Sequence, residues 1–270
     1  MIEAHLFYAS VVWITAWLLT SWPRGSATVK YWIWVATSIN FLLPLAAIPA
    51  RYVPLRLSWI TPRVRILSAA LDHPLATPLL ALWAIGSVAM FVRLCFRVRD
   101  RRIAATPMVV GLWRTRVSLP DGIERLLTRE EIDAVLQHES AHARRRDNLI
   151  RLLHEVSLCL FWFHPLVWMT RSHLALYREL SCDESVVQRD DLVTALAKLA
   201  EPAAPALLHA TAASFIGARL AQLDAGERRS AAANAMLVAL FAAILIASAI
   251  TPVAQSAERA LCIAEHSLPH

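Results

Sequence analysis

The sequence predicts a mainly helical membrane protein, with about four transmembrane helices and a helical domain outside the bilayer that contains a small strand region. Hydrophobic residues make up 57% of the 270-residue chain, above the roughly 45–50% of soluble domains. The mean hydropathy is +0.47. The apolar excess lies in long blocks, and a block of about 20 apolar residues is what a helix needs to cross the hydrocarbon core of a bilayer.

Four blocks have this length, and none of them contains Asp, Glu or Lys. They are residues 4–22, 31–50, 74–96 and 232–253. A shorter apolar stretch, residues 156–169, follows Arg151 and Glu155. Runs of about 10–14 apolar residues are usually buried or re-entrant helices, so we interpret it as one. A short fifth span is the alternative.

Positive charge predicts the orientation. Arginines follow the first and third spans, which places those loops in the cytoplasm, although the loop between the second and third spans also carries four arginines. We therefore expect a multi-pass protein of the inner (cytoplasmic) membrane, with residues 97–231 forming a cytoplasmic domain and residues 254–270 a short extracytoplasmic tail. The amino terminus has no basic region ahead of its apolar run, so we expect a retained anchor rather than a signal peptide.

The net charge is +6, and much of the excess is arginine at span ends. Such arginines normally meet anionic lipid headgroups. We expect the lipid bilayer to be a partner and expect no direct binding of nucleic acid.

The segment "LTREEIDAVLQHESAHARRRDN", residues 127–148, predicts a helix with a metal site. Thr128 and Glu131 fit a capping box at its start. Residues four apart share a helix face, so His138 and His142 can meet one metal ion with Glu139 beside it. A chance pairing of two histidines is the alternative. A second His-Glu pair begins at His154, but it has no following histidine at the required spacing, and we assign it no metal role.

A catalytic zinc generally takes three protein ligands. The segment "YRELSCDESV", residues 177–186, offers Glu179 and Asp183 four apart on an expected helix. We predict Glu179 as the third ligand and Asp183 as a carboxylate that orients a ligating histidine. Cys182 and Glu184 compete for the ligand role, and a solvated acidic helix end is the alternative without a metal.

Three segments together resemble the integral-membrane zinc metallopeptidases of the BlaR/MecR antibiotic-sensor type. They are "LTREEIDAVLQHESAHARRRDNLIRLL", "FWFHPLVW" and "YRELSCDESV". The resemblance implies a gluzincin site with one zinc ion per chain on His138, His142 and Glu179, and with Glu139 as the catalytic base. It also implies a protein substrate, classically a transcriptional repressor that is cleaved in the cytoplasm. The antibiotic sensors carry a penicillin-binding domain after their last span, where only residues 254–270 stand here, so we expect another route for the stimulus.

We therefore predict a signal-transducing membrane protease. A housekeeping protease for membrane proteins and a non-proteolytic signalling scaffold are the alternatives, and a homodimer is left open. Residues 107–120 suggest an extended stretch with a glycine turn, which could add a substrate strand or be purely structural. Residues 190–230 suggest two amphipathic helices. For the group that stabilises the oxyanion, Tyr177, His173 and His164 qualify by residue type alone.

Overall fold

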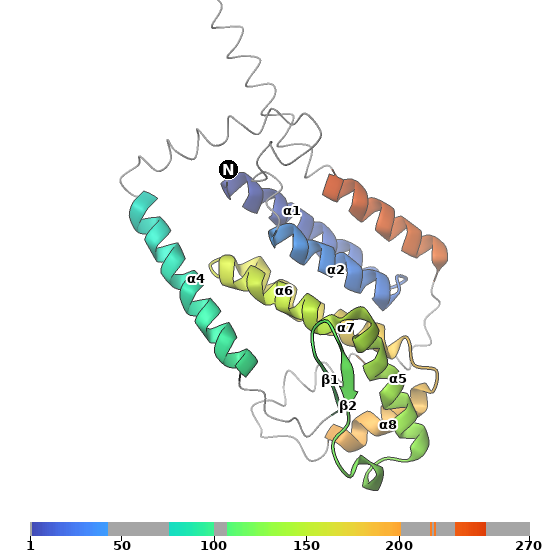
Figure 1. Cartoon of the computed structure of the whole chain (residues 1–270). Helices are drawn as coiled ribbons and strands as arrows, with labels where there is room; N and C mark the ends of the chain where they lie inside the picture. The colour runs from blue at the N-terminus through green and yellow to red at the C-terminus, as the bar shows by residue number, and fades with distance from the viewer. Residues whose placement is uncertain are drawn as a thin grey trace, which may run out of the picture.

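A computed structural model describes residues 2–42, 76–99, 107–200, 217, 219 and 230–246. The described chain is mainly helical, with one two-stranded sheet (Figure 1). Its elements are α1 (Ile2–Thr20), α2 (Ala27–Leu42), α4 (Ala76–Arg99), β1 (Met108–Val110), β2 (Arg116–Ser118), the short 3-10 helix η4 (Ile123–Arg125), α5 (Arg129–Arg145), α6 (Asp147–Leu160), α7 (Pro165–Asp183) and α8 (Arg189–Ala200). A further helix, Ala231–Ile246, lies beside α1 and α2.

The larger hydrophobic core lies among α1, α2, α6, α7 and the helix Ala231–Ile246. Its fully buried side chains include Trp34, Phe41 and Leu158. One hydrogen bond inside this core joins α1 to α7: Trp13 Nε1 donates to Thr170 Oγ1 at 3.0 Å. The amino-terminal helices are therefore packed directly on α7, the helix that carries most of the segment "YRELSCDESV".

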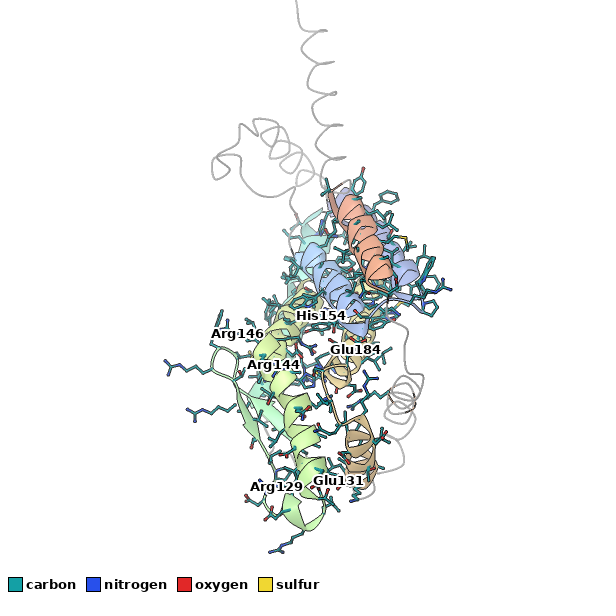
Figure 2. All side chains as sticks on the ribbon, turned by 90° about the vertical axis from the view of Figure 1, so that its right-hand side faces the viewer. Arg129, Glu131, Arg144, Arg146, His154 and Glu184 are labelled. Carbon is teal, nitrogen blue, oxygen red and sulfur yellow. The ribbon has the colours of Figure 1, made fainter. Side chains whose placement is uncertain are left out.

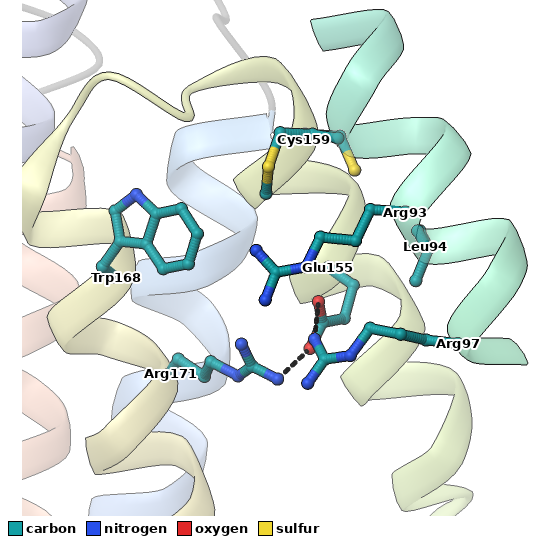
Figure 3. Close-up of a pocket in the computed structure, with 8 residues that line it drawn as sticks. Arg93, Leu94, Arg97, Glu155, Cys159, Trp168 and Arg171 are labelled. Carbon is teal, nitrogen blue, oxygen red and sulfur yellow. Dashed lines mark ion pairs between the residues drawn. The ribbon is translucent and has the colours of Figure 1, made fainter. Parts of the chain in front are cut away.

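The number of membrane spans is supported only in part. Within the described residues, one helix is long and apolar enough to cross a bilayer, Thr77–Val98 in α4, and most of its surface is left uncovered by the rest of the protein. The helices His5–Thr20 and Ala231–Ile246 are apolar but shorter. The expected spans at 31–50 and 232–253 continue into residues outside the described part of the chain, so the four-span arrangement stays a prediction. Helix α4 contacts α6, where Arg97 Nη1 lies 3.8 Å from Glu155 Oε2 (Figure 3).

The expectation of one helix over residues 156–169 is wrong. Helix α6 ends at Leu160 and α7 begins at Pro165. Proline restricts the preceding residue to extended conformations and suits the first turn of a new helix. His164 accordingly has φ −97° and ψ 115°. The break turns the chain so that α7 runs back along α6 toward the histidines of α5.

The capping box at the start of α5 is confirmed. Thr128 Oγ1 accepts from the Glu131 amide at 3.3 Å, and Glu131 Oε2 accepts from the Thr128 amide at 2.9 Å. Arg129 and Glu131 lie at the end of the molecule far from the apolar helices (Figure 2). Lys198 Nζ of α8 donates to Glu131 Oε1 at 2.8 Å. A second, smaller hydrophobic core between α5 and α8 includes Val135 and Leu192.

The carboxyl end of α5 bends sharply. Arg146 adopts a left-handed conformation with φ 57°, and α6 starts at the next residue, Asp147.

Just before α5 in the sequence, the expected extended stretch with a glycine turn is confirmed as the antiparallel hairpin β1–β2, and Gly111 takes φ 99°. The first helix expected in residues 190–230 is α8; the second lies outside the described residues, apart from positions 217 and 219.

Candidate metal centre

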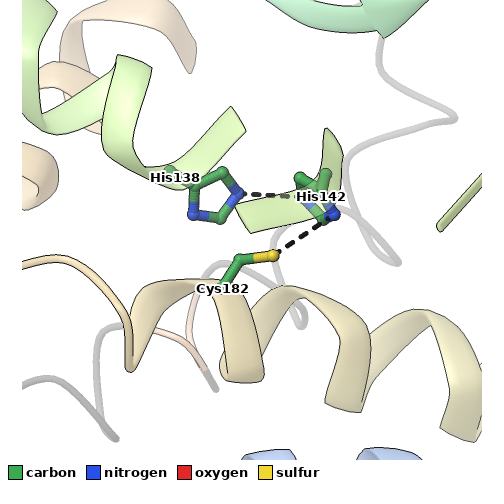
Figure 4. A group of neighbouring side chains, drawn as sticks. All are labelled: His138, His142 and Cys182. Atoms are coloured by element: carbon green, nitrogen blue, oxygen red, sulfur yellow. Dashed lines mark hydrogen bonds between the residues drawn. The ribbon is translucent and has the colours of Figure 1, made fainter. Parts of the chain in front are cut away.

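His138 and His142 lie one turn apart on the face of α5 that meets α7 (Figure 4). Their Nε2 atoms are 3.1 Å apart. His138 is buried, and His142 is only partly accessible. The helical spacing therefore brings two nitrogen donors to one point, as the sequence predicts.

Glu179 of α7 reaches the same point. Its Oε2 atom lies 3.5 Å from His138 Nε2 and 3.8 Å from His142 Nε2. Ligand atoms about 2.0–2.1 Å from a tetrahedral zinc ion are about 3.3 Å apart. The two nitrogens and this oxygen are close to that separation, and they are the donor types of a His-His-Glu set. The residues present therefore fit one zinc ion.

The outer nitrogens of both histidines face carboxylates. His138 Nδ1 lies 3.0 Å from Asp183 Oδ1, at ion-pair distance but without hydrogen-bond alignment, and His142 Nδ1 lies 2.6 Å from Asp147 Oδ2. A carboxylate at Nδ1 holds the proton there and leaves the Nε2 lone pair for a metal. Asp183 thus lies where the sequence predicts an orienting carboxylate, whereas Asp147 was not expected.

The charges at the centre are tightly coupled. Burial opposes ionisation of Glu179, but its contacts with His138 and His142 hold the pKa of its carboxyl well below the usual range. Burial lowers the pKa of His142, but the contacts with Asp147, Cys182 and Glu179 together outweigh it and raise that pKa to about 11. A metal ion would have to displace the proton from these histidines, so its binding would release protons.

Glu139 follows His138 on α5 and is partly buried. Burial raises the pKa of its carboxyl, and the nearby histidines oppose that rise. A carboxylate with increased proton affinity beside a metal site is suited to accept a proton from water.

The two competing ligands, Cys182 and Glu184, have other contacts. Cys182 Sγ is 3.3 Å from His142 Nδ1 and 2.7 Å from Arg145 Nη2. It groups with the two histidines within 4.8 Å, but it approaches the nitrogen that Asp147 already occupies. Glu184 accepts from the amides of Ala27 at 2.6 Å and Thr28 at 3.1 Å, next to the start of α2 (Figure 2).

Several residues that support the centre were missed in the sequence. Asp147 accepts from Tyr31 Oη of α2 at 2.7 Å and from Arg145 Nη2 at 2.7 Å. Its position five residues after His142 was the available signal, but in the charged run "RRRDN" the sequence does not show which side chains turn inward. Arg145 instead points inward, while Arg144 and Arg146 are exposed.

Arg219 is the second unexpected contributor. Its Nε and Nη2 atoms donate to the two carboxylate oxygens of Asp183 at 2.7 and 2.6 Å, and its Nη1 lies 3.7 Å from Glu179 Oε2. Arg178 donates to the other oxygen of Glu179 at 2.8 Å. Nothing in the spacing of the motifs singles out a residue so far along the chain.

The three residues considered for oxyanion stabilisation have other contacts. The Tyr177 hydroxyl donates to the Thr20 carbonyl at 3.0 Å, the His173 ring stacks on Trp34 with centroids 4.2 Å apart, and His164 Nε2 lies 3.5 Å from Ser10 Oγ. All three thus pack against α1 or α2. His154 likewise lies apart from the centre, with Nδ1 2.9 Å from Ser38 Oγ.

The hairpin is tied to the same region. Asn148, which follows Asp147, donates from Nδ2 to the carbonyls of Val109 at 2.9 Å and Gly111 at 3.0 Å. Because these two carbonyls are already satisfied, a substrate strand would have to pair elsewhere on the hairpin. Strand addition stays a prediction.

Comparison with known proteins agrees with this geometry. The family model described as BlaR1 peptidase M56 matches residues 98–194. Over 86 residues, 32% of this chain, the sequence is 33% identical to the "Regulatory protein BlaR1" of Bacillus licheniformis. Over 82 residues, 30% of this chain, it is 28% identical to the "Methicillin resistance mecR1 protein" of Staphylococcus aureus and of Staphylococcus epidermidis.

The alignments cover 14% of the length of each of these relatives. No solved structure matches the chain significantly. The family match contains His138, His142, Glu179 and Asp183, which are the residues that converge in the structure. Residues 98–194 of this chain therefore match the BlaR/MecR-type M56 peptidase family.

Proposed function

We propose that this protein is a membrane-embedded zinc metalloendopeptidase with a regulatory role, and that it cleaves a cytoplasmic protein such as a transcriptional repressor. The observation that carries the proposal is the convergence of His138 Nε2, His142 Nε2 and Glu179 Oε2, with separations of 3.1, 3.5 and 3.8 Å. The regulatory part rests on the names of the relatives, one a regulatory protein and one a methicillin resistance protein.

His138, His142 and Glu179 would hold one zinc ion per chain. The chemistry that zinc supplies when bound is Lewis acidity, which polarises a carbonyl and lowers the pKa of a water molecule to about 7. Glu139 accepts the proton of the attacking water and delivers it to the amine that leaves. Asp183 and Asp147 hold the two imidazole rings with Nε2 toward the centre.

The same proposal includes the membrane arrangement. The domain of residues 97–231 would lie on the cytoplasmic side of the inner membrane, with four spans around it and residues 254–270 outside. Support comes from the arginines at the carboxyl end of α4, because positive charge next to a span favours the cytoplasm.

The direct test compares new protein amino termini in cells that express the wild-type chain or Glu139→Gln at matched levels. Glu130→Gln is the control, because Glu130 is an exposed residue of the same helix. Cut sites that occur with wild type and Glu130→Gln but vanish with Glu139→Gln support the proposal and identify the substrate. Zinc content should be equal in all three proteins.

A few specific sites would indicate a regulatory protease, and many sites in misfolded membrane proteins would indicate a housekeeping one. If all three proteins bind zinc and give identical profiles under every stress applied, proteolysis is wrong and the scaffold alternative stands.

A further inference from the structure

A groove separate from the metal centre lies where α4 meets α6 and α7 (Figure 3). Arg93 and Arg97 of α4, Glu155 of α6, and Trp168 and Arg171 of α7 line it. Nothing in the proposed protease chemistry uses these residues. They are far from the start of α5, and they surround the end of the one helix in the described residues that is long and apolar enough to span a bilayer.

The carboxylate in this groove is already shared by two arginines. Glu155 Oε1 lies 3.0 Å from Arg171 Nη2, and its Oε2 lies 3.8 Å from Arg97 Nη1. The guanidinium of Arg93 extends from α4 into the groove, and no carboxylate of the described residues forms an ion pair with it. Glu155 therefore holds two guanidinium groups in place, and Arg93 remains available to an anion.

Positive charge is in excess around the groove. Three arginines and one carboxylate line the groove, which leaves a net charge of +2. Arg151, one helical turn before Glu155, adds a further positive charge nearby. The pKa of Arg151 is lowered, first by burial and second by the positive charge of Arg178. The charges of Arg171 and Arg97 lower it further. Like charges held this close repel one another, and a bound anion would relieve the repulsion.

The position of the groove along α4 indicates where the anion would come from. The 24 residues of α4 extend about 36 Å at 1.5 Å per residue, whereas the hydrocarbon core is about 30 Å thick. The excess of about 6 Å is about one helical turn, so Arg97 would reach the headgroup level, and the long side chain of Arg93, one turn earlier, would extend toward it. Trp168 is a side chain typical of this interface.

We propose that this groove binds the phosphate of an anionic phospholipid, with Arg93 and Arg171 as the main phosphate contacts and Glu155 as the residue that positions Arg97 and Arg171. Guanidinium groups bind phosphate through paired hydrogen bonds, and basic pockets between membrane helices bind anionic headgroups. The site lies on α7, two turns before Glu179 on the same helix, but its occupancy does not depend on the metal centre or on protease activity.

Native mass spectrometry of the full chain, released from nanodiscs that contain phosphatidylglycerol and phosphatidylcholine, tests the proposal. We expect one phosphatidylglycerol retained per chain in preference to phosphatidylcholine. Arg93→Gln breaks no ion pair of the described residues and should reduce the affinity about 5-fold; Arg93→Gln with Arg171→Gln should reduce it about 30-fold.

The matched control is Arg125→Gln with Arg129→Gln, which removes the same charge from exposed positions at the far end of the molecule and should retain the lipid. Equal retention of the two lipids, or unchanged retention in Arg93→Gln, would overturn the proposal. If millimolar inorganic phosphate displaces phosphatidylglycerol completely, the groove is a site for soluble phosphate and the lipid assignment is wrong.

Discussion

Asp147 illustrates how one buried side chain can organise a metal centre from outside the ligand set. It contacts His142, Arg145 and Tyr31 at once, with distances of 2.6 and 2.7 Å. Burial opposes its ionisation, but the hydrogen bonds from His142 and Arg145 lower the pKa of its carboxyl. It therefore stays charged and fixes the ring of His142, while Asp183, held by Arg219, faces the ring of His138.

The ligand set can be tested by comparing Glu179→Ala with Cys182→Ala. Because Glu179 Oε2 faces both Nε2 atoms, its loss should weaken zinc binding by more than the roughly 10–100-fold that loss of an outer carboxylate costs. Cys182→Ala should keep the wild-type affinity, measured by competition with a chelator. The opposite pattern would assign the third position to the thiolate.

Tyr31 links the amino-terminal helices to the metal centre. Tyr31→Phe removes only the hydroxyl that donates to Asp147 at 2.7 Å, so we expect zinc affinity to fall by up to about 10-fold with the ligands intact. The measurement is the zinc dissociation constant of the full chain. Tyr8→Phe, a matched change on α1, is the control, and equal affinities for the two variants would remove Tyr31 from this role.

At the level of elements, the site depends on where three helices begin and end. Helix α5 starts at its capping box and ends at Arg145. Arg146, in the left-handed conformation, turns the chain, and α6 begins at Asp147. Pro165 starts α7, which brings Glu179 and Asp183 against α5. Each boundary is set by a few local residues, and together they determine which side chains meet.

Thr128→Ala tests the first boundary. Loss of an N-cap hydroxyl costs about 1 kcal/mol, because the Glu131 amide then has no side-chain acceptor. We expect the amides in the first turn of α5 to exchange hydrogen about fivefold faster, as measured by mass spectrometry. Thr128→Ser should restore the wild-type rate; unchanged exchange in Thr128→Ala would show that the cap contributes little.

Glu131 should make the same helix sensitive to acid. Two hydrogen bonds lower the pKa of Glu131 below its ordinary value of 4.5: the stronger effect comes from the Lys198 side chain and the weaker from the Thr128 amide. A depressed carboxyl pKa stabilises the folded state above the unfolded-state pKa, and this contribution is lost as the pH falls through the folded-state value. Glu131→Gln should flatten the dependence of unfolding temperature on pH below about 4.5, whereas Glu124→Gln, an exposed control, should not.

At the scale of the whole molecule, the peptidase motifs and the amino-terminal helices form one packed unit. Helix α7 buries its first half against α1 and α2 and presents Glu179 and Asp183 from its last turns. Glu184 then accepts hydrogen bonds from the start of α2. A displacement of α2 would therefore change the contact of Tyr31 with Asp147 and the contacts of Glu184 with the start of α2.

Removal of metal should weaken this unit as a whole. A ligand that binds only the folded state at 100 times its dissociation constant contributes about 2.7 kcal/mol. We expect a strong chelator to lower the unfolding temperature of the full chain and added zinc to restore it. In His138→Ala with His142→Ala the unfolding temperature should not respond to zinc; a full response there would place the stabilising zinc elsewhere.

What the sequence by itself determined is local. The capping box, the helix of His138 and His142, and the glycine turn of the hairpin depend on residues a few positions apart, whose geometry follows from helix and turn periodicity. The same spacing suggested Glu179 and Asp183. Residues 156–169 were misjudged because their hydrophobicity was considered without Pro165, the residue at which a new helix begins.

Only the tertiary structure decided which distant groups meet. Asp147 was hidden in a run of charges, Tyr31 in an apolar block and Arg219 far beyond the motifs, yet all three reach the residues around the centre. Cys182 and Glu184 are neighbours of Asp183 in sequence but point to Arg145 and α2. The physical reason is that such contacts depend on how helices cross and on where buried charges find partners, and neither is encoded in the spacing of any one segment.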